Sequence, residues 1–176
     1  MSALIPPASS RDHVRGPSRA QITVVEYGDF ECPHCGTAYW IVKEIERRLP
    51  REVRVVYRHF PLSKIHPHAE HAAEIAEAAA QHGKFWPMHD MLFEHQDALD
   101  DESLLAYAEV LGIDPAWAAA ALTEGRFHRR VRDDFASGVR SGVNGTPTFF
   151  VNDERFNGSA EELLATLMQA TIDAPL

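Results

Sequence analysis

The order of hydrophobic patterns along the sequence predicts an α/β domain of the form β-α-β, helices, β-β-α. Two short runs rich in β-branched residues, 22–27 and 53–57, flank a helical pattern. From about 62 to 142 the pattern is helical throughout, and strand-like residues return at 148–151. These observations favour one central sheet with an all-helical insertion between its two halves.

The first part of the chain is typical of a β-α-β unit. Residues 22–27 are nearly all apolar, as in a strand that is buried on both faces. Alternation at Val53, Val55 and Tyr57 indicates a second strand, and a crossover of this length implies that the two strands are parallel. The helix expected between them has one apolar face, made of Ala38, Ile41, Val42, Ile45 and Leu49.

The insertion is expected to contain five helices. They cover residues 69–80, an alanine-rich stretch that Gly83 ends, 85–93, with an interruption near Pro87, 104–111, a helix that begins at Asp114 and Pro115, and 127–139.

The last part predicts a hairpin and a helix. Residues 148–151 and 155–156 are strand-like, and Asn152 and Asp153 between them favour a tight turn. Ser159 and Glu162 have the spacing of a capping box, which indicates where the final helix begins.

Composition limits the classes of function. The 176 residues fit one domain, which we expect to span 21–176, preceded by a flexible arm at 1–20 that is rich in proline and serine. The net charge of -9 disfavours nucleic acid as a partner. No apolar run is long enough for membrane insertion, and the first residues lack the apolar stretch of a signal peptide. We therefore expect a cytoplasmic protein, or one of the cell envelope if an export signal has been removed.

Cys32 and Cys35 are the two cysteines of the chain. A pair with this spacing can be a redox pair, half of a metal site or a structural crosslink. Resting disulfides are uncommon in the cytoplasm, so redox chemistry or metal binding is favoured.

The position of this pair favours redox chemistry. Cys32 lies where the first strand gives way to a helix, and Pro33 occupies the preferred first helical position. Unpaired N–H groups and the positive end of the helix dipole stabilise a thiolate there. Protonated His34 would lower the pKa of the thiol further. Cys35 is one turn along the helix and can attack a mixed disulfide held on Cys32.

Two further features lie near the pair in the predicted fold. Glu26 is an acid in an apolar strand, where burial would raise its pKa and suit it to exchange protons with Cys35. Pro147 immediately precedes the later strand, and the Thr146–Pro147 bond is a candidate for a cis peptide that turns the Thr146 backbone outward to pair with an extended peptide.

The motif Cys32-Pro33-His34-Cys35, the acid six residues upstream and the late stretch GTPTFFV together resemble the DsbA-like branch of the thioredoxin superfamily, known from bacteria. The resemblance covers about residues 20–170 and extends to the stretches FPL at 60–62, HPHA at 66–69 and GKFW at 83–86. It implies a thioredoxin-like fold and a thiol-disulfide oxidoreductase that acts without a cofactor on protein or small-molecule thiols and an unidentified redox partner. It also implies that Cys32 attacks, Cys35 resolves, Pro147 is cis and Glu26 is the buried acid, with Thr146 before the proline.

Two alternatives remain open from the residues alone. A zinc site would need about four ligands, and His66, His68 and His71 are candidates to join the two thiolates. A peptide-binding module could also keep this fold without catalysis.

Overall fold

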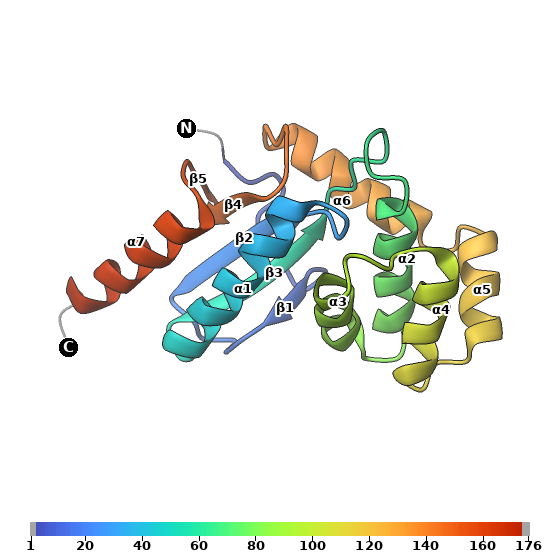
Figure 1. Ribbon diagram of the computed structural model, residues 1–176. Helices are drawn as coiled ribbons and strands as arrows, with labels where there is room; N and C mark the ends of the chain where they lie inside the picture. Colours follow the sequence, from blue (N-terminus) through green and yellow to red (C-terminus); the bar gives the residue numbers. More distant parts are fainter. Residues whose placement is uncertain (1–2, 174–176) are drawn as a thin grey trace.

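A five-stranded mixed sheet forms the centre of the computed structural model, which describes residues 3–173 (Figure 1). The strand order is β1-β3-β2-β4-β5. The central pair, β2 and β3, is parallel as predicted, and the other pairs are antiparallel. The strands are β1 His13–Arg15, β2 Ile22–Gly28, β3 Val53–His59, β4 Thr148–Val151 and β5 Glu154–Phe156.

Helices cover the sheet and form a separate lobe at one end of it (Figure 1). Helix α1, Pro33–Arg48, packs with α7, Ala160–Asp173, against one face of the sheet. Between β3 and β4 the chain is helical, which confirms the predicted insertion. These helices are α2 Ala69–Ala80, α3 Phe85–Glu94, α4 Asp101–Val110, α5 Pro115–Thr123 and α6 His128–Arg140.

Local sequence signals explain several of these boundaries. Asp114 caps α5 by accepting a hydrogen bond from the Ala116 N–H. Ser159 and Glu162 exchange the two hydrogen bonds of a capping box, at 2.7 and 3.2 Å. Asn152 and Asp153 both have positive φ, as the tight turn of the predicted hairpin requires.

Helix α3 differs from the prediction, because it is not interrupted at Pro87. Pro87 is the third residue of the helix, where a backbone N–H has no intrahelical partner to lose. A proline in the first turn is therefore compatible with an unbroken helix.

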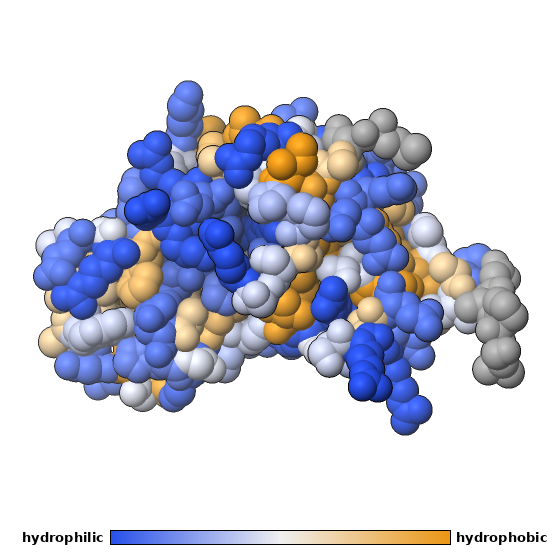
Figure 2. Space-filling model, turned by 180° about the vertical axis from the view of Figure 1, so that it is seen from behind, coloured by the Kyte–Doolittle hydropathy of each residue, from blue (hydrophilic) through white to orange (hydrophobic). Residues whose placement is uncertain are grey.

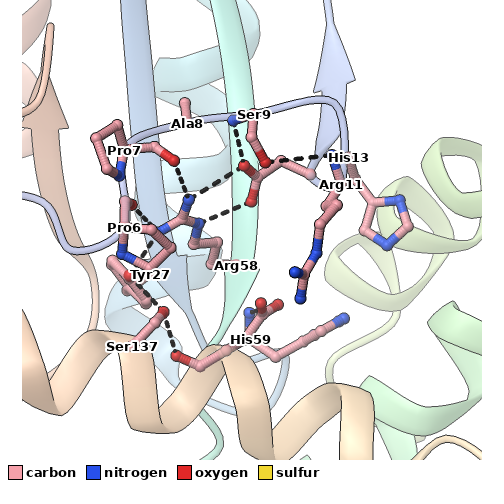
Figure 3. Close-up of polar contacts among 12 residues, drawn as sticks. Pro6, Pro7, Ala8, Ser9, Arg11, His13, Tyr27, Arg58, His59 and Ser137 are labelled. Atoms are coloured by element: carbon pink, nitrogen blue, oxygen red, sulfur yellow. Dashed lines mark hydrogen bonds and ion pairs between the residues drawn. The ribbon is translucent and has the colours of Figure 1, made fainter.

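The segment before β2 differs from the expected mobile arm. Leu4 is only 2% exposed, and β1 pairs with β3. Arg58 of β3 holds this segment from within the domain, donating to Asp12 at 2.8 and 3.1 Å and to the carbonyl oxygens of Pro6 and Pro7 (Figure 3). The anchor lies 46 residues away from Asp12, so the composition of the segment gives no sign of it.

Hydrophilic side chains cover most of the face seen from behind, and hydrophobic ones gather near its middle and at its upper edge (Figure 2). Among residues 3–173 no helix has the length and apolar character that crossing a membrane requires.

Candidate active site

The two cysteines lie at the start of α1, beside the carboxyl end of β2. Cys32 is the N-cap residue, with extended backbone angles of φ -73 and ψ 121, and Pro33 follows at the first helical position. Cys32 is 4% exposed, Cys35 is 0% exposed, and both are free thiols. Pro33 and His34 are exposed to solvent at the same helix start.

The surroundings of Cys32 favour its thiolate. A hydrogen bond with the Cys35 thiol is the largest cause that lowers the pKa of Cys32, to about 5, against the opposing effect of burial. The Thr146 side chain and the backbone N–H groups of Cys35 and His34 add smaller contributions in the same direction. His34 thus contributes to the lowered pKa of Cys32 through its backbone N–H group.

The surroundings of Cys35 favour its protonated thiol instead. Burial raises its pKa well above the usual value for a thiol, and the hydrogen bond to Cys32 and the negative charge of Glu26 raise it further. The pair is thus divided into a stabilised thiolate at Cys32 and a retained proton at Cys35.

Glu26 lies beneath this pair on β2 and is 3% exposed. Burial raises its pKa to about 8, with Arg15 opposing and the charge of Cys32 reinforcing the shift. Among residues 3–173, neither its Oε1 atom nor the hydroxyl of Tyr57 on β3 has a hydrogen-bond partner. A carboxyl group with this pKa can gain or lose a proton near neutral pH.

Thr146 and Pro147 approach the cysteines from the start of β4, and the peptide bond between them is cis. The carbonyl oxygen of Thr146 is 3.5 Å from Cys32 Sγ, so this carbonyl faces the thiol and is not simply turned outward. A cavity of about 290 Å³ adjoins this point and is lined in part by His34, Thr146 and Pro147. The structure thus brings all the predicted site residues, from three separate segments, to one end of the sheet.

Sequence reasoning missed the contacts that fix the loop before Cys32. Asp29 is 2% exposed and accepts hydrogen bonds from the N–H of Leu62 and from His66 Nδ1, at 2.8 and 2.7 Å. Gln96, just after α3, donates to the carbonyl oxygen of Cys32 at 3.0 Å. The acid just before the motif and the histidine in the HPH stretch were visible in the sequence, but nothing there indicated that they meet.

Two of the three histidines considered for zinc have other side-chain contacts. His66 is bound to Asp29, and His71 Nδ1 lies 2.6 Å from Asp101. Within the described residues, two clusters have ligand atoms close enough for one ion, and both lie apart from the cysteine pair. They are His13, His59 and Glu77, and Glu70, Glu74 and His128.

The fold and the paired cysteines define a thioredoxin-like protein with a thiol site at a helix start. A family model described as Thioredoxin matches residues 8–173. The chain therefore belongs to the thioredoxin family.

Solved structures agree with this assignment. Oxidised BdbD from Bacillus subtilis superimposes with a TM-score of 0.85 at 23% identity, covering 97% of this chain and 96% of that one. A thioredoxin-like oxidoreductase from Silicibacter pomeroyi gives a TM-score of 0.79 at 27% identity, covering 94% and 95% of the two chains. For alpha-DsbA1 of Wolbachia pipientis the TM-score is 0.79 at 18% identity, with 98% of both chains covered.

The curated relatives are named as antiporters and not as thioredoxin-like proteins. A protein named Na(+)/H(+) antiporter NhaA 3, from Salinispora tropica, is 47% identical over 175 residues, which are 98% of this chain and 27% of that protein. Na(+)/H(+) antiporter NhaA 1 of Salinispora arenicola is 48% identical over 156 residues, 89% of this chain and 24% of that protein. The chain thus spans about a quarter of the length of these relatives.

Proposed function

We propose that the chain exchanges a Cys32–Cys35 disulfide with protein or small-molecule thiols through a mixed disulfide on Cys32. The observation that carries the proposal is the placement of two free thiols at the start of α1. Cys32 lies at the N-cap, which stabilises its thiolate, and Cys35 is fully buried, which keeps its proton in place until it is needed.

Each site residue has a distinct role in this proposal. The Cys32 thiolate attacks a substrate disulfide, and a substrate thiolate leaves. The Cys35 thiol then gives up its proton, attacks Cys32 and releases the second substrate thiolate. Glu26 accepts that proton, since its pKa of about 8 lies near the working pH. In the opposite direction the same bonds form and break in reverse.

The substrate is proposed to lie along Thr146 and Pro147. A peptide in extended form would pair with the Thr146 backbone. Because the Thr146 carbonyl oxygen lies 3.5 Å from Cys32 Sγ, a cysteine of that peptide would lie close to the Cys32 sulfur. Pro33 and His34 flank the same opening, where Pro33 fixes the helix start and His34 supplies its N–H group.

The direction of exchange is proposed to follow the compartment. A stabilised thiolate is a good leaving group, which makes the disulfide form oxidising. In the cytoplasm, poised near or below about -220 mV, such a pair would stay reduced and act as a reductase or isomerase. In the cell envelope the same pair would act as an oxidant. Trapping free thiols with an alkylating reagent in intact cells shows whether the pair is kept reduced or oxidised.

A single-turnover experiment tests the exchange itself. The Cys35→Ser variant, incubated with oxidised glutathione, should accumulate one glutathione per chain, located on Cys32 by peptide mass spectrometry. The Cys32→Ser variant is the matched control and should accumulate none. If neither variant forms the adduct and the wild-type protein reduces no disulfide, exchange is excluded and a non-catalytic peptide-binding role becomes the better account.

The curated relatives support a proposal about the partner. Since 98% of this chain matches a region of a protein named as an antiporter, we propose that the exchange operates beside a Na(+)/H(+) antiporter, in the same polypeptide or in a complex with it. The Cys35→Ser variant, expressed in its own cell, should then be recovered with antiporter sequences in the same complex or chain. Recovery of the intact variant without them would contradict this proposal.

A further inference from the structure

Two buried polar atoms beneath the cysteine pair have no hydrogen-bond partner among the described residues. They are Glu26 Oε1 on β2 and the Tyr57 hydroxyl on β3. The two residues are direct neighbours in the parallel register of these strands, so their side chains project from the same face of the sheet. A buried polar group without a hydrogen bond destabilises the fold, and two such groups on adjacent strands call for a functional explanation.

The Tyr57 ring is fixed so that its hydroxyl lies near the carboxyl end of β2. A Cβ atom built on Gly28 would lie only 2.7 Å from that hydroxyl, so the Tyr57 hydroxyl lies directly over Gly28. Phe30 stacks on the ring at 5.1 Å, and His89 contacts it edge-on at 4.7 Å. With neighbours on these sides and 0% exposure, the ring has no room to turn its hydroxyl away.

The Tyr57 hydroxyl interacts electrostatically with both Cys35 and Glu26, the two groups that must exchange a proton. Burial raises the pKa of Tyr57 well above its usual value, and among the charges that raise it further, Cys35 comes first and Glu26 second. The Cys35 thiol is itself 0% exposed, so bulk water cannot accept its proton directly. A phenolic hydroxyl both donates and accepts a hydrogen bond, and so it can receive one proton while passing on another.

We propose that Tyr57 is a proton-relay residue, whose hydroxyl connects Cys35 to Glu26 with water molecules between the groups. The inference rests on the proposed exchange reaction and adds to it the residue that carries the proton of the second step.

The Tyr57 hydroxyl accepts the proton of the Cys35 thiol while its own proton passes to the Glu26 carboxylate. Cys35 sulfur forms a bond to Cys32 sulfur, the bond from Cys32 to the substrate sulfur breaks, and the substrate leaves as a thiolate. Tyr57 ends the step neutral, Glu26 ends it protonated, and the two electrons that the cysteine pair loses reduce the substrate disulfide.

The test isolates this second step. Cys32 is loaded with glutathione on the full chain at low pH, the pH is raised, and free glutathione is counted over time by acid quenching and mass analysis. For the wild type, the release rate should rise with pH through an inflection near the Glu26 pKa of about 8. Tyr57→Phe should slow release roughly ten-fold or more at neutral pH and should lose that inflection.

Two comparisons make the result specific. Tyr57→Phe combined with Glu26→Gln should be no slower than the slower single variant, because the two residues act as one unit. Tyr27→Phe is the matched control, since it removes a buried hydroxyl from the other face of the same strand pair, and its release rate should stay within two-fold of the wild type. Attack of Cys32 on oxidised glutathione should be unchanged in Tyr57→Phe.

The outcomes separate this inference from the exchange proposal. A wild-type protein that never forms or releases the glutathione adduct overturns the exchange itself. A wild type that releases glutathione while Tyr57→Phe keeps both the rate and the inflection overturns the role of Tyr57 alone. An equal slowing of the first and second steps in Tyr57→Phe would also overturn it, because a relay affects only the second.

Discussion

Two neighbouring pairs of residues on β2 and β3 differ by one position and face opposite sides of the sheet. Tyr27 and Arg58 are paired in register and carry a saturated network: Arg58 donates to the Tyr27 hydroxyl at 2.9 Å, and that hydroxyl meets Ser137 Oγ at 2.7 Å (Figure 3). Glu26 and Tyr57 are paired one step earlier and leave a carboxyl oxygen and a hydroxyl without hydrogen-bond partners in the part of the chain that the structure describes.

The difference shows how one strand pair can serve two purposes. A saturated buried network fixes structure, because each group would lose hydrogen bonds on moving. An unsaturated one costs stability and retains groups that are free to exchange protons with a neighbour. In this chain the saturated face holds the N-terminal segment, and the unsaturated face lies beneath the thiols.

The largest expected effect is on disulfide exchange, at the two thiols that lie above the unsaturated face. Cys32→Ser should reduce disulfide exchange to the background rate, because the attacking thiolate is gone. Cys35→Ser should keep the first attack and lose the release step. Rapid-mixing measurements with oxidised glutathione distinguish the two, and exchange that persists in Cys32→Ser would show that Cys32 is not the nucleophile.

On the saturated face, Arg58→Ala should lower the free energy of unfolding by about 3–5 kcal/mol, since Asp12 would be left as an unpaired buried charge. Urea unfolding measures this. The control is Arg126→Ala, which breaks an exposed ion pair with Glu124 and should change the free energy of unfolding far less. Equal losses of unfolding free energy in the two variants would contradict a structural role for the saturated face. A changed pKa of Cys32 in Arg58→Ala would show that this face also influences the thiols.

The order of helices and strands was predictable because each has its own hydrophobic period, and because Asp114, Ser159 and Gly83 mark boundaries locally. The site residues were found for the same reason: Cys32, Cys35 and the Thr146–Pro147 step are local motifs. The N-terminal anchor was not predictable, because Arg58 reads as a polar position in an alternating strand. Tyr57 read as an ordinary core residue for a similar reason, since its missing partner is a property of the packed structure.

Glu26→Gln should change how stability depends on pH. The folded pKa of about 8 lies above the ordinary 4.5, so the neutral carboxyl favours the folded state at low pH, and this contribution disappears as pH rises through about 8. The variant cannot ionise and should become more stable than the wild type above neutral pH, by a few kcal/mol at most. Thermal unfolding of both proteins at pH 5 and pH 9 measures this difference in stability. A difference between variant and wild type that is the same at both pH values would contradict a raised pKa of Glu26.

The smallest expected effect belongs to Tyr27→Phe. Removing its hydroxyl leaves Arg58 and Ser137 each one partner short and should cost about 1–2 kcal/mol in unfolding free energy. Ser141→Ala provides a comparison, since its hydroxyl bonds the Ile5 backbone at the same segment. A changed rate of disulfide exchange in Tyr27→Phe would mean that the saturated face also takes part in the chemistry.

The most direct test is an ultraviolet thiolate titration of the reduced protein. The account predicts one thiolate with a pKa near 5, absent in Cys32→Ser and kept in large part in Cys35→Ser, whose hydroxyl can still donate the hydrogen bond. It also predicts a clear rise in this pKa in Cys35→Ala, which has no donor. A Cys32 pKa close to the ordinary 9.0, or one that does not differ between Cys35→Ser and Cys35→Ala, would contradict the account.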